Sequence, residues 1–567
     1  MSSWKKNYTK WYDRLDTNLR PELDEMSAEE KEEAFGSSLT FGTAGLRGIL
    51  GHGTNRMNIQ IIHQTTEGLA RWIEEQGDEA KERGVAISYD NRHYSDSFAF
   101  EAAKVLGQHG IKSYVFEELN PTPVLSFAVR YYQAIAGIMV TASHNPPNYN
   151  GFKVYGEDGG QFPPEAAARL TDFINEIESP FDIEVADAEA LQAEGTIELV
   201  GEEVLAAYLE ELKEVTVNPS LAEKVGSDIH FVYSAMHGAG TQLAKKSFDQ
   251  AGFTNISYVE SQCQADPDFS TVKSPNPETE EAFDLSKELA EEVDADVLFA
   301  TDPDADRLGV CVRTGVEDYT LLSGNQTAAL MLDYLVTQSN LPENPALIRS
   351  LVSSHLPDAI AKAHGVEVYE VLTGFKFIAD KIKEFEKTGS HEMILGFEEA
   401  IGYLVKPFVR DKDAFQALVL MAEVAAYHFE EGRNLVDALE LIYERYGYYY
   451  DRTISVQYPG LSGQETMEKI MTEVRQAQLE NIADYDVVKT DDYLTRESSA
   501  GDGQIETLDY PSSNVLRYTF EDGGWIALRP SGTEPKIKLY MSAIGESMAD
   551  AQSKVDSYEQ AMRGKIE

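Results

Sequence analysis

The sequence predicts an α/β protein of several domains, and three observations support this fold class. Short apolar runs alternate along most of the chain with segments of helical period, as in mixed, largely parallel sheets that are covered by helices. The 567 residues exceed what one hydrophobic core organises, so three or four domains are expected. A hydrophobic content of 42% with 10% aromatic residues is typical of folded proteins and argues against large-scale disorder.

The chain is strongly acidic, with a formal net charge of −49. Nucleic acids and anionic membranes repel such a charge, so neither is an expected partner. The charge fits a salt-adapted protein, or simply an acidic surface that keeps an enzyme soluble. Cys263 and Cys311 are the only cysteines, which argues against a disulfide framework. The N-terminus has no apolar signal core, and no run approaches the roughly 18 apolar residues of a membrane span, so we expect a cytoplasmic protein.

The first 36 residues are charged and amphipathic, which predicts a helical lead-in docked on the body of the protein. Its expected packing contacts are Trp4, Trp11, Tyr12 and Leu15. The segment 41–48, FGTAGLRG, follows. Three glycines around Arg47 form a loop whose backbone can approach an anion, with a planar donor in its midst. Glycine-rich turns are common, so this segment alone is a weak indication.

The next segment predicts a first α/β unit, with a helix over 62–73 and strands at 85–89 and 111–116. The apolar run 138–140 predicts a buried strand that ends in an exposed, rigid turn, TASHNPPN. Ser143 and His144 lie on this turn, at the carboxyl end of a strand, where ligands of such sheets gather. A hydroxyl on a stiff turn can be presented at low entropic cost, and nearby Lys153 can offset phosphate charge. An ordinary polar loop is the alternative.

A second α/β pattern begins near residue 206. It has a predicted strand at 229–234, a helix face that recurs at every fourth position over 285–293, and a strand at 297–300. This last strand opens into the loop TDPDADR.

Three aspartates alternate on that loop, so their carboxylates can converge on one hard cation: Asp302, Asp304 and Asp306. An EF-hand loop is excluded, because Arg307 and Arg313 occupy the places of its required glycine and glutamate. The alternative is a solvated acidic loop in an acidic chain.

A third α/β unit is predicted from about 326 to 450. Its landmarks are the turn TGFK, which carries Lys376, and a strand that runs into Glu398 and Glu399. The last part of the chain changes character, with strand-like runs at 514–520 and 525–528 around the loop RPSGTEP.

That last loop provides fork-shaped donors, hydroxyls and free backbone amides for a phosphate dianion, from Arg529, Ser531, Gly532 and Thr533. A plain surface turn is the alternative. A final helix is predicted to place one face on a core, with Met548, Ala551, Val555, Tyr558 and Met562.

Five loops of the chain together resemble those of the α-D-phosphohexomutases: GTAGLRG, TASHNP with NGFK, DPDADR, GFEEAIGY and RPSGTEPK. They occur in the family's order between residues 41 and 538, closest to the longer phosphoglucomutase/phosphomannomutase branch with its phosphopentomutase-like members. The resemblance implies four domains around a central cleft, at 1–205, 206–325, 326–450 and 451–567. The first three would share a related α/β core, and the fourth would be an α+β domain of the TATA-box-binding-protein type.

The resemblance also implies a reaction, the interconversion of glucose 1-phosphate and glucose 6-phosphate, with mannose phosphates as further substrates. Phosphorylated Ser143 would give its phosphoryl group to the sugar, and glucose 1,6-bisphosphate would be the intermediate and activator. One Mg²⁺ per chain would be held by the aspartates and Ser143, beside Arg307. The implied catalytic residues besides Ser143 are Arg47, His144, Lys153 and Lys376. The implied sugar and phosphate contacts are Glu398, Arg529, Ser531, Gly532 and Thr533.

The sequence departs from many relatives at Ala400, where a serine is common, so one hydroxyl contact to the sugar is in doubt. A mutase for pentose phosphates or a hexose bisphosphate synthase would use the same loops. A phosphosugar-binding regulator without turnover is the alternative from another class. The presence of Ser143 and all three aspartates counts against it, because a binder needs no nucleophile together with a metal. The expected partners are small sugar phosphates, and a monomer and a dimer are both compatible with the sequence.

Overall fold

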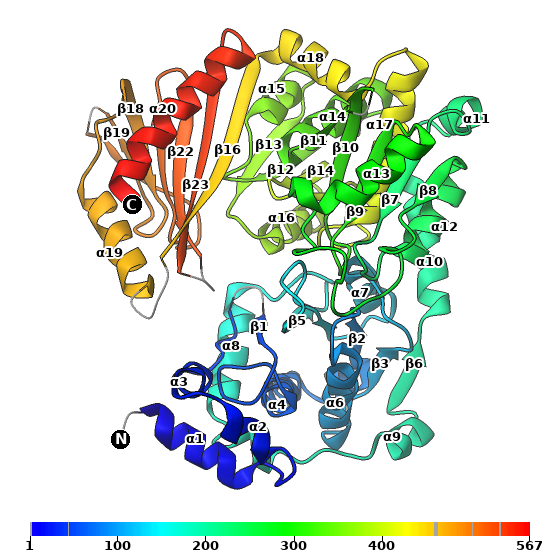
Figure 1. Cartoon of the computed structure of the whole chain (residues 1–567), viewed down its shortest axis with the longest axis vertical. Coiled ribbons are helices and arrows are strands. Elements are labelled where there is room, and N and C mark those ends of the chain that lie inside the picture. The colour runs from blue at the N-terminus through cyan, green and yellow to red at the C-terminus, as the bar shows by residue number, and fades with distance from the viewer. Residues whose placement is uncertain (1–2, 43–44, 317, 459–462, 502, 532–534) are drawn as a thin grey trace. The chain divides into compact units, whose positions relative to one another are not determined.

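The computed structural model describes residues 3–42, 45–316, 318–458, 463–501, 503–531 and 535–567 (Figure 1). The described residues form two compact units. The first takes in those of Met1–Ser323, Phe375–Gly389 and Ala400–Asn434, and the second those of Gly324–Gly374, Ser390–Glu399 and Leu435–Glu567. Parts of the predicted third domain, 326–450, therefore occur in both units.

The predicted helical lead-in is confirmed as three helices: α1 (Ser3–Arg14), α2 (Arg20–Glu25) and α3 (Ala28–Phe35). Ser27 starts α3 with a reciprocal capping box, in which its hydroxyl accepts from the backbone N–H of Glu30 and the Glu30 carboxylate accepts from that of Ser27. Trp11 and Leu15 are buried in the core of the first unit, and Trp4 and Tyr12 pack against it half-buried. The lead-in is thus docked, as expected.

The first sheet of the first unit is mixed. Its strand order is β1 (Leu46–Ile49), β5 (Tyr149–Gly156), β4 (Ala136–Val140), β2 (Val85–Tyr89), β3 (Ser113–Phe116) and β6 (Ile197–Val200). The strands from β4 to β6 pair in parallel, whereas β5 and β1 are antiparallel additions at one edge. The expected strand 85–89 is β2, while β3 begins two residues later than the apolar run at 111.

The second sheet of this unit is also mixed, in the order β11 (Asp318–Leu322), β10 (Leu308–Gly315), β9 (Val297–Thr301), β7 (Phe231–Ser234) and β8 (Ile256–Tyr258). Here β9, β7 and β8 are parallel, and β10 and β11 are antiparallel. The prediction of mixed sheets is confirmed: in both sheets the parallel strands extend to one edge, and the antiparallel strands lie at the other.

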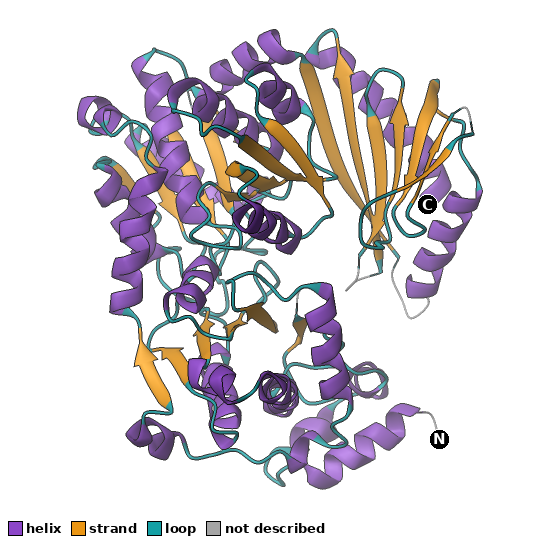
Figure 2. Cartoon of the chain, turned by 180° about the vertical axis from the view of Figure 1, so that it is seen from behind, coloured by secondary structure: helices purple, strands orange, loops and turns teal. Residues whose placement is uncertain are grey.

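Helices cover these sheets (Figures 1 and 2). They are α4 (Ile59–Gln76), α5 (Asp78–Arg83), α6 (Ser95–Gln108), α7 (Thr122–Tyr131), α8 (Pro164–Asn175), α9 (Ala188–Glu194), α10 (Glu202–Leu212), α11 (Ser220–Val225), α12 (Thr241–Ala251) and α13 (Asp284–Val293). The later segments of the unit add α16 (Phe375–Thr388), β15 (Gly402–Leu404) and α17 (Ala414–Glu430). The almost fully buried α17 packs against β9, β10 and α12. It therefore covers β9, the strand that leads to the aspartate loop.

The second unit combines a parallel sheet with a larger antiparallel one. The parallel strands are β13 (Glu367–Val371), β12 (Pro345–Ser350) and β14 (Glu392–Glu398), accompanied by α14 (Gly324–Gln338), α15 (Leu356–Ala363) and α18 (Leu435–Tyr446). The antiparallel sheet runs β16 (Tyr448–Gln457), β23 (Lys536–Gly545), β22 (Trp525–Pro530), β21 (Leu516–Phe520), β18 (Tyr485–Asp492), β19 (Glu497–Ala500) and β20 (Ile505–Thr507), with β17 (Asn481–Ile482) beside β18.

Two helices pack on the antiparallel sheet, α19 (Gly463–Gln476) and α20 (Met548–Ile566) (Figure 2). The predicted face of the final helix is confirmed, because Ala551, Val555, Tyr558 and Met562 are fully buried. Met548 is half-buried. The α+β character expected for this part of the chain is therefore present.

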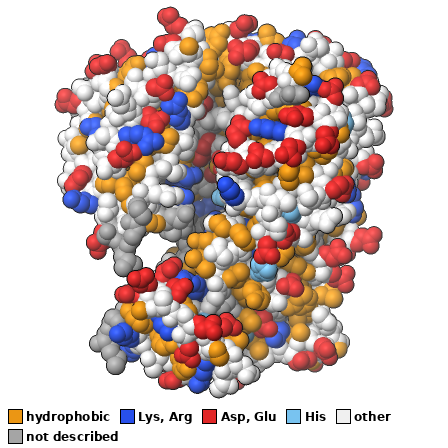
Figure 3. All heavy atoms as spheres, viewed as in Figure 1, with side chains coloured by type: hydrophobic (Ala, Val, Ile, Leu, Met, Phe, Trp, Pro, Cys, Tyr) orange, Lys and Arg blue, Asp and Glu red, His pale blue; other side chains and the backbone are white. Residues whose placement is uncertain are grey.

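Acidic side chains are spread over the face shown in Figure 3, in keeping with the net charge of −49. Both cysteines are free thiols. Among the described helices, none combines the length and the apolar composition that crossing a bilayer requires.

A buried charge network joins the two sheets of the second unit. Glu370 on β13 accepts from Arg349 of β12 at 2.9 Å and from Arg517 of β21 at 2.8 Å. Arg349 also forms a two-pronged pair with Asp358, at 2.6 Å for both contacts. Burial alone would raise the pKa of Glu370, but Arg517 and Arg349 outweigh it and hold the pKa well below its usual range.

The Glu370 carboxylate therefore contributes stability above its unfolded pKa of about 4.3, and this contribution is lost as the pH falls toward its folded value. We expect Glu370→Gln to lower the thermal midpoint at pH 7, since leaving a buried ion pair without one partner costs about 3–5 kcal/mol. Between pH 5 and pH 3, the thermal midpoint of the variant should also fall less than that of the wild-type protein. The matched control is Glu367→Gln at the exposed start of the same strand. Equal midpoints for both variants at pH 7 would contradict the assignment.

Candidate functional site

Ser143 lies on the turn that follows β4, held in an unusual backbone conformation. Its φ of +51° is in the left-handed region, which costs a non-glycine residue about 1–2 kcal/mol. The Ser143 hydroxyl donates to Asp302 Oδ2 at 2.7 Å and lies 3.2 Å from His144 Nδ1. Ser143 is only 3% exposed. The prediction of an exposed turn is thus wrong at this residue, because the aspartate loop packs onto the hydroxyl.

The aspartate loop leaves the carboxyl end of β9, as predicted. Asp302, Asp304 and Asp306 are buried, and each offers a carboxylate oxygen within 4.8 Å of those of the other two. Within the described structure, the Oδ1 atoms of Asp304 and Asp306 have no hydrogen-bond partner. Buried carboxylate oxygens without donors are costly unless a cation binds them, so this donor set fits a hard divalent ion such as Mg²⁺.

Gly238 allows its loop to pack closely against the aspartate loop. A Cβ added at Gly238 would lie 2.3 Å from Pro303 Cα, which no side chain tolerates. The backbone N–H of Ala239 donates to the Pro303 carbonyl at 2.8 Å. From the first domain, the Thr122 hydroxyl donates to Asp304 Oδ2 at 3.0 Å. These contacts hold the aspartate loop in addition to the contact from Ser143.

Two lysines partly neutralise the three carboxylates. Lys153 Nζ lies 2.7 Å from Asp304 Oδ2 and 3.8 Å from Asp306 Oδ2. Lys412 Nζ lies 3.1 Å from Asp306 Oδ2. Burial raises the pKa of Asp302, and the neighbouring carboxylates raise it further. Burial alone would also raise the pKa of Asp304, but the ammonium group of Lys153 holds it below its usual range. A cation bound by the triad requires these carboxylates in their ionised form.

Sequence reasoning missed Lys412. It lies in the segment RDKD, residues 410–413, where all four charged residues are buried ahead of α17. Asp413 caps that helix by accepting from the N–H groups of Phe415 and Gln416. Four successive charges directly before a helix that is apolar on all sides cannot all be solvated, and this signal was available in the sequence.

Arg47 lies beside the serine turn, as the resemblance implies. It is on β1, and its Nη1 donates to Asn145 Oδ1 at 2.7 Å. Gly45 has a φ of +89°, and a Cβ there would lie 2.2 Å from the Phe152 carbonyl oxygen, so β1 can approach β5 only with glycine at this position. Thr43 and Ala44 of the same motif lie outside the described residues.

Arg307 contacts the aspartates, and Lys376 lies on a neighbouring helix of the same unit. The backbone N–H of Arg307 donates to Asp302 Oδ1 at 3.1 Å, and its Nε lies 3.7 Å from Asp306 Oδ1. Lys376 is in the first turn of α16, where burial lowers its pKa. Its neighbour Phe375 places its ring 5.5 Å from Lys412 Nζ. The first unit thus contains the predicted catalytic residues, and the serine turn, Arg47 and Lys153 are joined to the aspartate loop or to one another by direct contacts.

The second unit holds the predicted sugar and phosphate contacts. At the end of β14, half-buried Glu398 accepts from the Gly374 N–H at 2.6 Å. Its neighbour Glu399 accepts from the Ser350 hydroxyl at 2.8 Å, and burial raises the Glu399 pKa. Glu398, which the resemblance implies as a contact to the sugar, thus already has one backbone partner.

The predicted phosphate loop follows β22. Arg529 pairs across the sheet with Lys538 on β23, so two cations lie at the base of the loop. The backbone N–H of Ser531 donates to the Lys536 carbonyl at 2.8 Å. Gly532 and Thr533, also predicted as phosphate contacts, lie outside the described residues.

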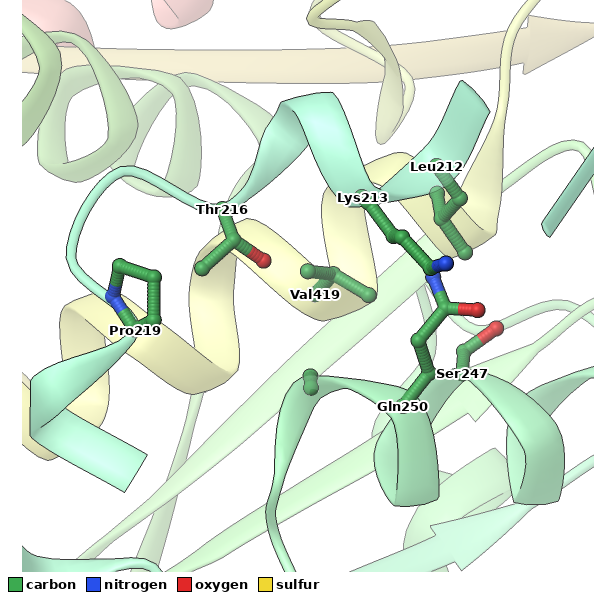
Figure 4. A pocket seen from close by; sticks show the side chains of 8 residues that line it. Leu212, Lys213, Thr216, Pro219, Ser247, Gln250 and Val419 are labelled. Atoms are coloured by element: carbon green, nitrogen blue, oxygen red, sulfur yellow. The ribbon is translucent and has the colours of Figure 1, made fainter. Parts of the chain in front are cut away.

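A separate cavity of about 170 Å³ lies between α12 and α17 (Figure 4). Its lining side chains are mostly apolar or neutral: Leu212, Lys213, Thr216, Pro219, Ser247, Gln250, Ala251 and Val419. It contains no nucleophile paired with a base or a metal-binding group among these residues, so it does not compete with the Ser143 site as a catalytic centre.

Comparison with known families agrees with this geometry. Models described as phosphoglucomutase/phosphomannomutase match in chain order: alpha/beta/alpha domain I at residues 38–181, domain II at 206–315, domain III at 323–446, and the C-terminal domain at 462–553. These matches cover most of the chain.

Individual proteins show the same similarity. The phosphoglucomutase of Staphylococcus saprophyticus is 39% identical over 95% of this chain and 96% of its own length. The phosphoglucomutase of Staphylococcus haemolyticus is 37% identical over 98% of this chain and 99% of its own length. Among solved structures, pp63/parafusin from Paramecium shares the fold, with a TM-score of 0.69, 18% identity, and coverage of 93% of this chain and 96% of that one. A phosphoglucomutase/phosphomannomutase family protein from Burkholderia thailandensis has a TM-score of 0.65 and 19% identity, with coverage of 93% of this chain and 97% of that one.

A buried serine against an aspartate triad, four matching domain models and near-complete coverage by relatives thus agree, and the chain belongs to the phosphoglucomutase/phosphomannomutase family.

Proposed function

We propose that the protein is a phosphoglucomutase that interconverts glucose 1-phosphate and glucose 6-phosphate, with mannose phosphates as further substrates. The observation that carries this proposal is the position of Ser143 Oγ, 2.7 Å from Asp302 Oδ2 at the edge of a buried carboxylate triad. A hydroxyl at this position can carry a phosphoryl group next to the cation that such a triad binds. Phosphoglucomutases named as relatives match the chain over nearly its whole length.

In the proposed reaction, Ser143 starts as a phosphoserine. A sugar hydroxyl attacks the phosphorus, its bond to phosphorus forms as the bond to Ser143 Oγ breaks, and the product is glucose 1,6-bisphosphate. Return of the other phosphoryl group regenerates the phosphoserine. The attacking hydroxyl loses a proton, and the departing serine oxygen gains one. His144 and Lys153 are the proposed carriers of these protons, since both lie within hydrogen-bond reach of the serine turn or the triad.

The proposed metal ligands are Asp302, Asp304, Asp306 and a phosphoryl oxygen on Ser143. Bound Mg²⁺ would neutralise the charge that collects on the phosphoryl oxygens during transfer. Arg47, tied to the serine turn through Asn145, would add a planar donor to the same oxygens. Lys412 would hold Asp306 in place.

The proposed contacts to the rest of the substrate come from two further loops of the chain. Glu398 would accept from sugar hydroxyls. The proposed partners of the phosphate that does not react are Arg529, Ser531, Gly532 and Thr533. Binding energy gained there can orient the distant hydroxyl for attack. We further propose domain limits at 1–205, 206–325, 326–450 and 451–567, and a cytoplasmic location.

A coupled assay tests the proposed function. Purified protein is given glucose 1-phosphate with Mg²⁺ and a trace of glucose 1,6-bisphosphate, and glucose 6-phosphate is measured with a dehydrogenase. Parallel reactions use mannose, glucosamine and pentose 1-phosphates. We expect the highest kcat/KM with glucose 1-phosphate. A higher value with a pentose phosphate would replace this proposal with a phosphopentomutase.

We expect only modest discrimination between glucose and mannose phosphates, because Ala400 offers no side-chain hydroxyl. A net hydrogen bond contributes about 0.5–1.5 kcal/mol, which is a two- to tenfold effect. Ala400→Ser should therefore change the ratio of kcat/KM for the two sugars by less than about tenfold. Glu398→Ala should lower kcat/KM for both, with exposed Glu392→Ala at the start of β14 as the control. Full activity of Glu398→Ala would show that the sugar is held elsewhere.

A further inference from the structure

The carbonyl groups of the serine turn converge on one buried arginine that lies outside the predicted site. Nη2 of Arg92 donates to the carbonyls of Ser143 at 2.5 Å and Asn145 at 2.6 Å. Nη1 donates to those of Pro146 at 2.9 Å and Tyr149 at 3.1 Å. One guanidinium group therefore binds three carbonyls of the turn and that of the first residue of β5, and it uses all the N–H groups of its two terminal nitrogens.

The Arg92 side chain is itself held from two sides. Its Nε lies 3.3 Å from Asp90 Oδ2, and both side chains are 0% exposed. Asp90 also accepts from the backbone N–H of Arg92 at 2.9 Å and from the Ser95 hydroxyl at 2.8 Å. On the other side, the guanidinium lies 4.9 Å from the ring centre of Phe269. The rigid planar group thus has a single position relative to the turn.

The same arginine connects the serine turn to the second domain. Its two neighbours bind the segment that carries Phe269: Asn91 Nδ2 donates to the Asp266 carbonyl at 3.0 Å, and His93 Nε2 lies 2.7 Å from Asp268 Oδ1. The backbone N–H of Asp266 donates to the carbonyl of His237, which precedes the glycine packed on Pro303 of the aspartate loop. A chain of direct contacts therefore runs from the serine turn to the loop of its metal ligands.

We propose that Arg92 is a positioning residue that fixes the strained serine turn against the aspartate loop, so that Ser143 Oγ keeps its place beside the triad. This inference rests on the proposed function. It follows from the backbone at Ser143, since a left-handed serine persists only where its surroundings enforce it. Arg92 binds the carbonyl of that residue. It does not touch the reacting atoms, and its effect reaches them through the backbone.

Arg92→Lys tests the proposal, because an ammonium group has three donors on a flexible stem and cannot hold four carbonyls in one plane. The control is Arg349→Lys in the second unit, an arginine that is equally buried but binds carboxylates instead of the carbonyls of the turn. In Arg92→Lys we expect kcat to fall about 10- to 100-fold, the scale of a misplacement of roughly 1 Å, with KM for glucose 1-phosphate changed little. Guanidinium ion should restore part of kcat in Arg92→Ala.

Amide hydrogen exchange over 143–149 provides a reading that does not depend on turnover. We expect faster exchange there in Arg92→Lys and no change in Arg349→Lys. Unchanged exchange would overturn the proposal, and so would faster exchange with kcat within twofold of wild type. If wild type itself had no mutase activity, the proposed function would fail, while the exchange data would still decide whether Arg92 holds the turn.

A second variant covers the case in which Arg92→Lys does not fold. Phe269→Leu keeps the four carbonyl contacts and removes only the ring that packs on the guanidinium. A smaller loss of kcat, with faster exchange over 143–149, supports the proposal. Wild-type kcat and exchange in this variant would overturn the link to the aspartate loop.

Discussion

Ser143→Ala is expected to remove nearly all turnover while leaving a folded protein. The hydroxyl is the proposed carrier of the phosphoryl group, and loss of a covalent nucleophile lowers kcat by about 10³-fold or more. The fold should persist, because alanine fits the space of serine and the turn retains its backbone contacts to Arg92. The measurements are kcat for glucose 1-phosphate and the thermal midpoint.

The matched control for this variant is Ser247→Ala. Ser247 is also buried in the first unit, where its hydroxyl donates to the Leu243 carbonyl at 2.7 Å within α12. Its loss should cost stability of about 1 kcal/mol and little activity. A Ser143→Ala variant that kept a tenth of the wild-type kcat would show that another group carries the phosphoryl.

Removal of the metal, or of one of its ligands, is the second change with a large expected effect. Exhaustive chelation should abolish activity, and added Mg²⁺ should restore it. Asp304→Asn should weaken Mg²⁺ binding, because it deletes one charge from the donor set and also the partner of Lys153. Binding can be followed without turnover as the rise in thermal midpoint with Mg²⁺, since a ligand of the native state stabilises it.

The control for the metal ligand is Asp249→Asn on the exposed side of α12, which deletes the same charge away from the triad. It should show the wild-type response to Mg²⁺. Full activity after chelation, or an equal Mg²⁺ response in Asp304→Asn and wild type, would remove the metal from the account.

The parts of the site that the sequence predicted share a local signal. Asp302, Asp304 and Asp306 alternate on one loop after an apolar strand, so their convergence follows from neighbouring residues. The serine turn and β4 could be predicted for the same reason. The lead-in helices also follow from local periodicity and a capping box.

Other features depend on contacts between distant residues and could not be read locally. Lys412 and Asp306 lie more than a hundred positions apart, and nothing near Lys412 indicates that pairing. Arg92 is one arginine in a polar turn until the fold places it under the carbonyls of 143–149. The burial of Ser143 likewise arises from a loop of another domain. Strand ends were displaced by a few residues, because sheet partners rather than apolar runs decide where pairing stops.

The central claim is that Ser143 carries a phosphoryl group that it exchanges with the substrate. The direct measurement is peptide-resolved mass spectrometry of the purified protein after incubation with Mg²⁺ and isotope-labelled glucose 1,6-bisphosphate, and again after addition of excess unlabelled glucose 1-phosphate. The account predicts one added labelled phosphoryl group, on the peptide that contains Ser143, and its replacement by an unlabelled one in the second step as the label passes to the sugar phosphate. A phosphoryl group on another residue, or none in a preparation that turns over glucose 1-phosphate, would contradict it.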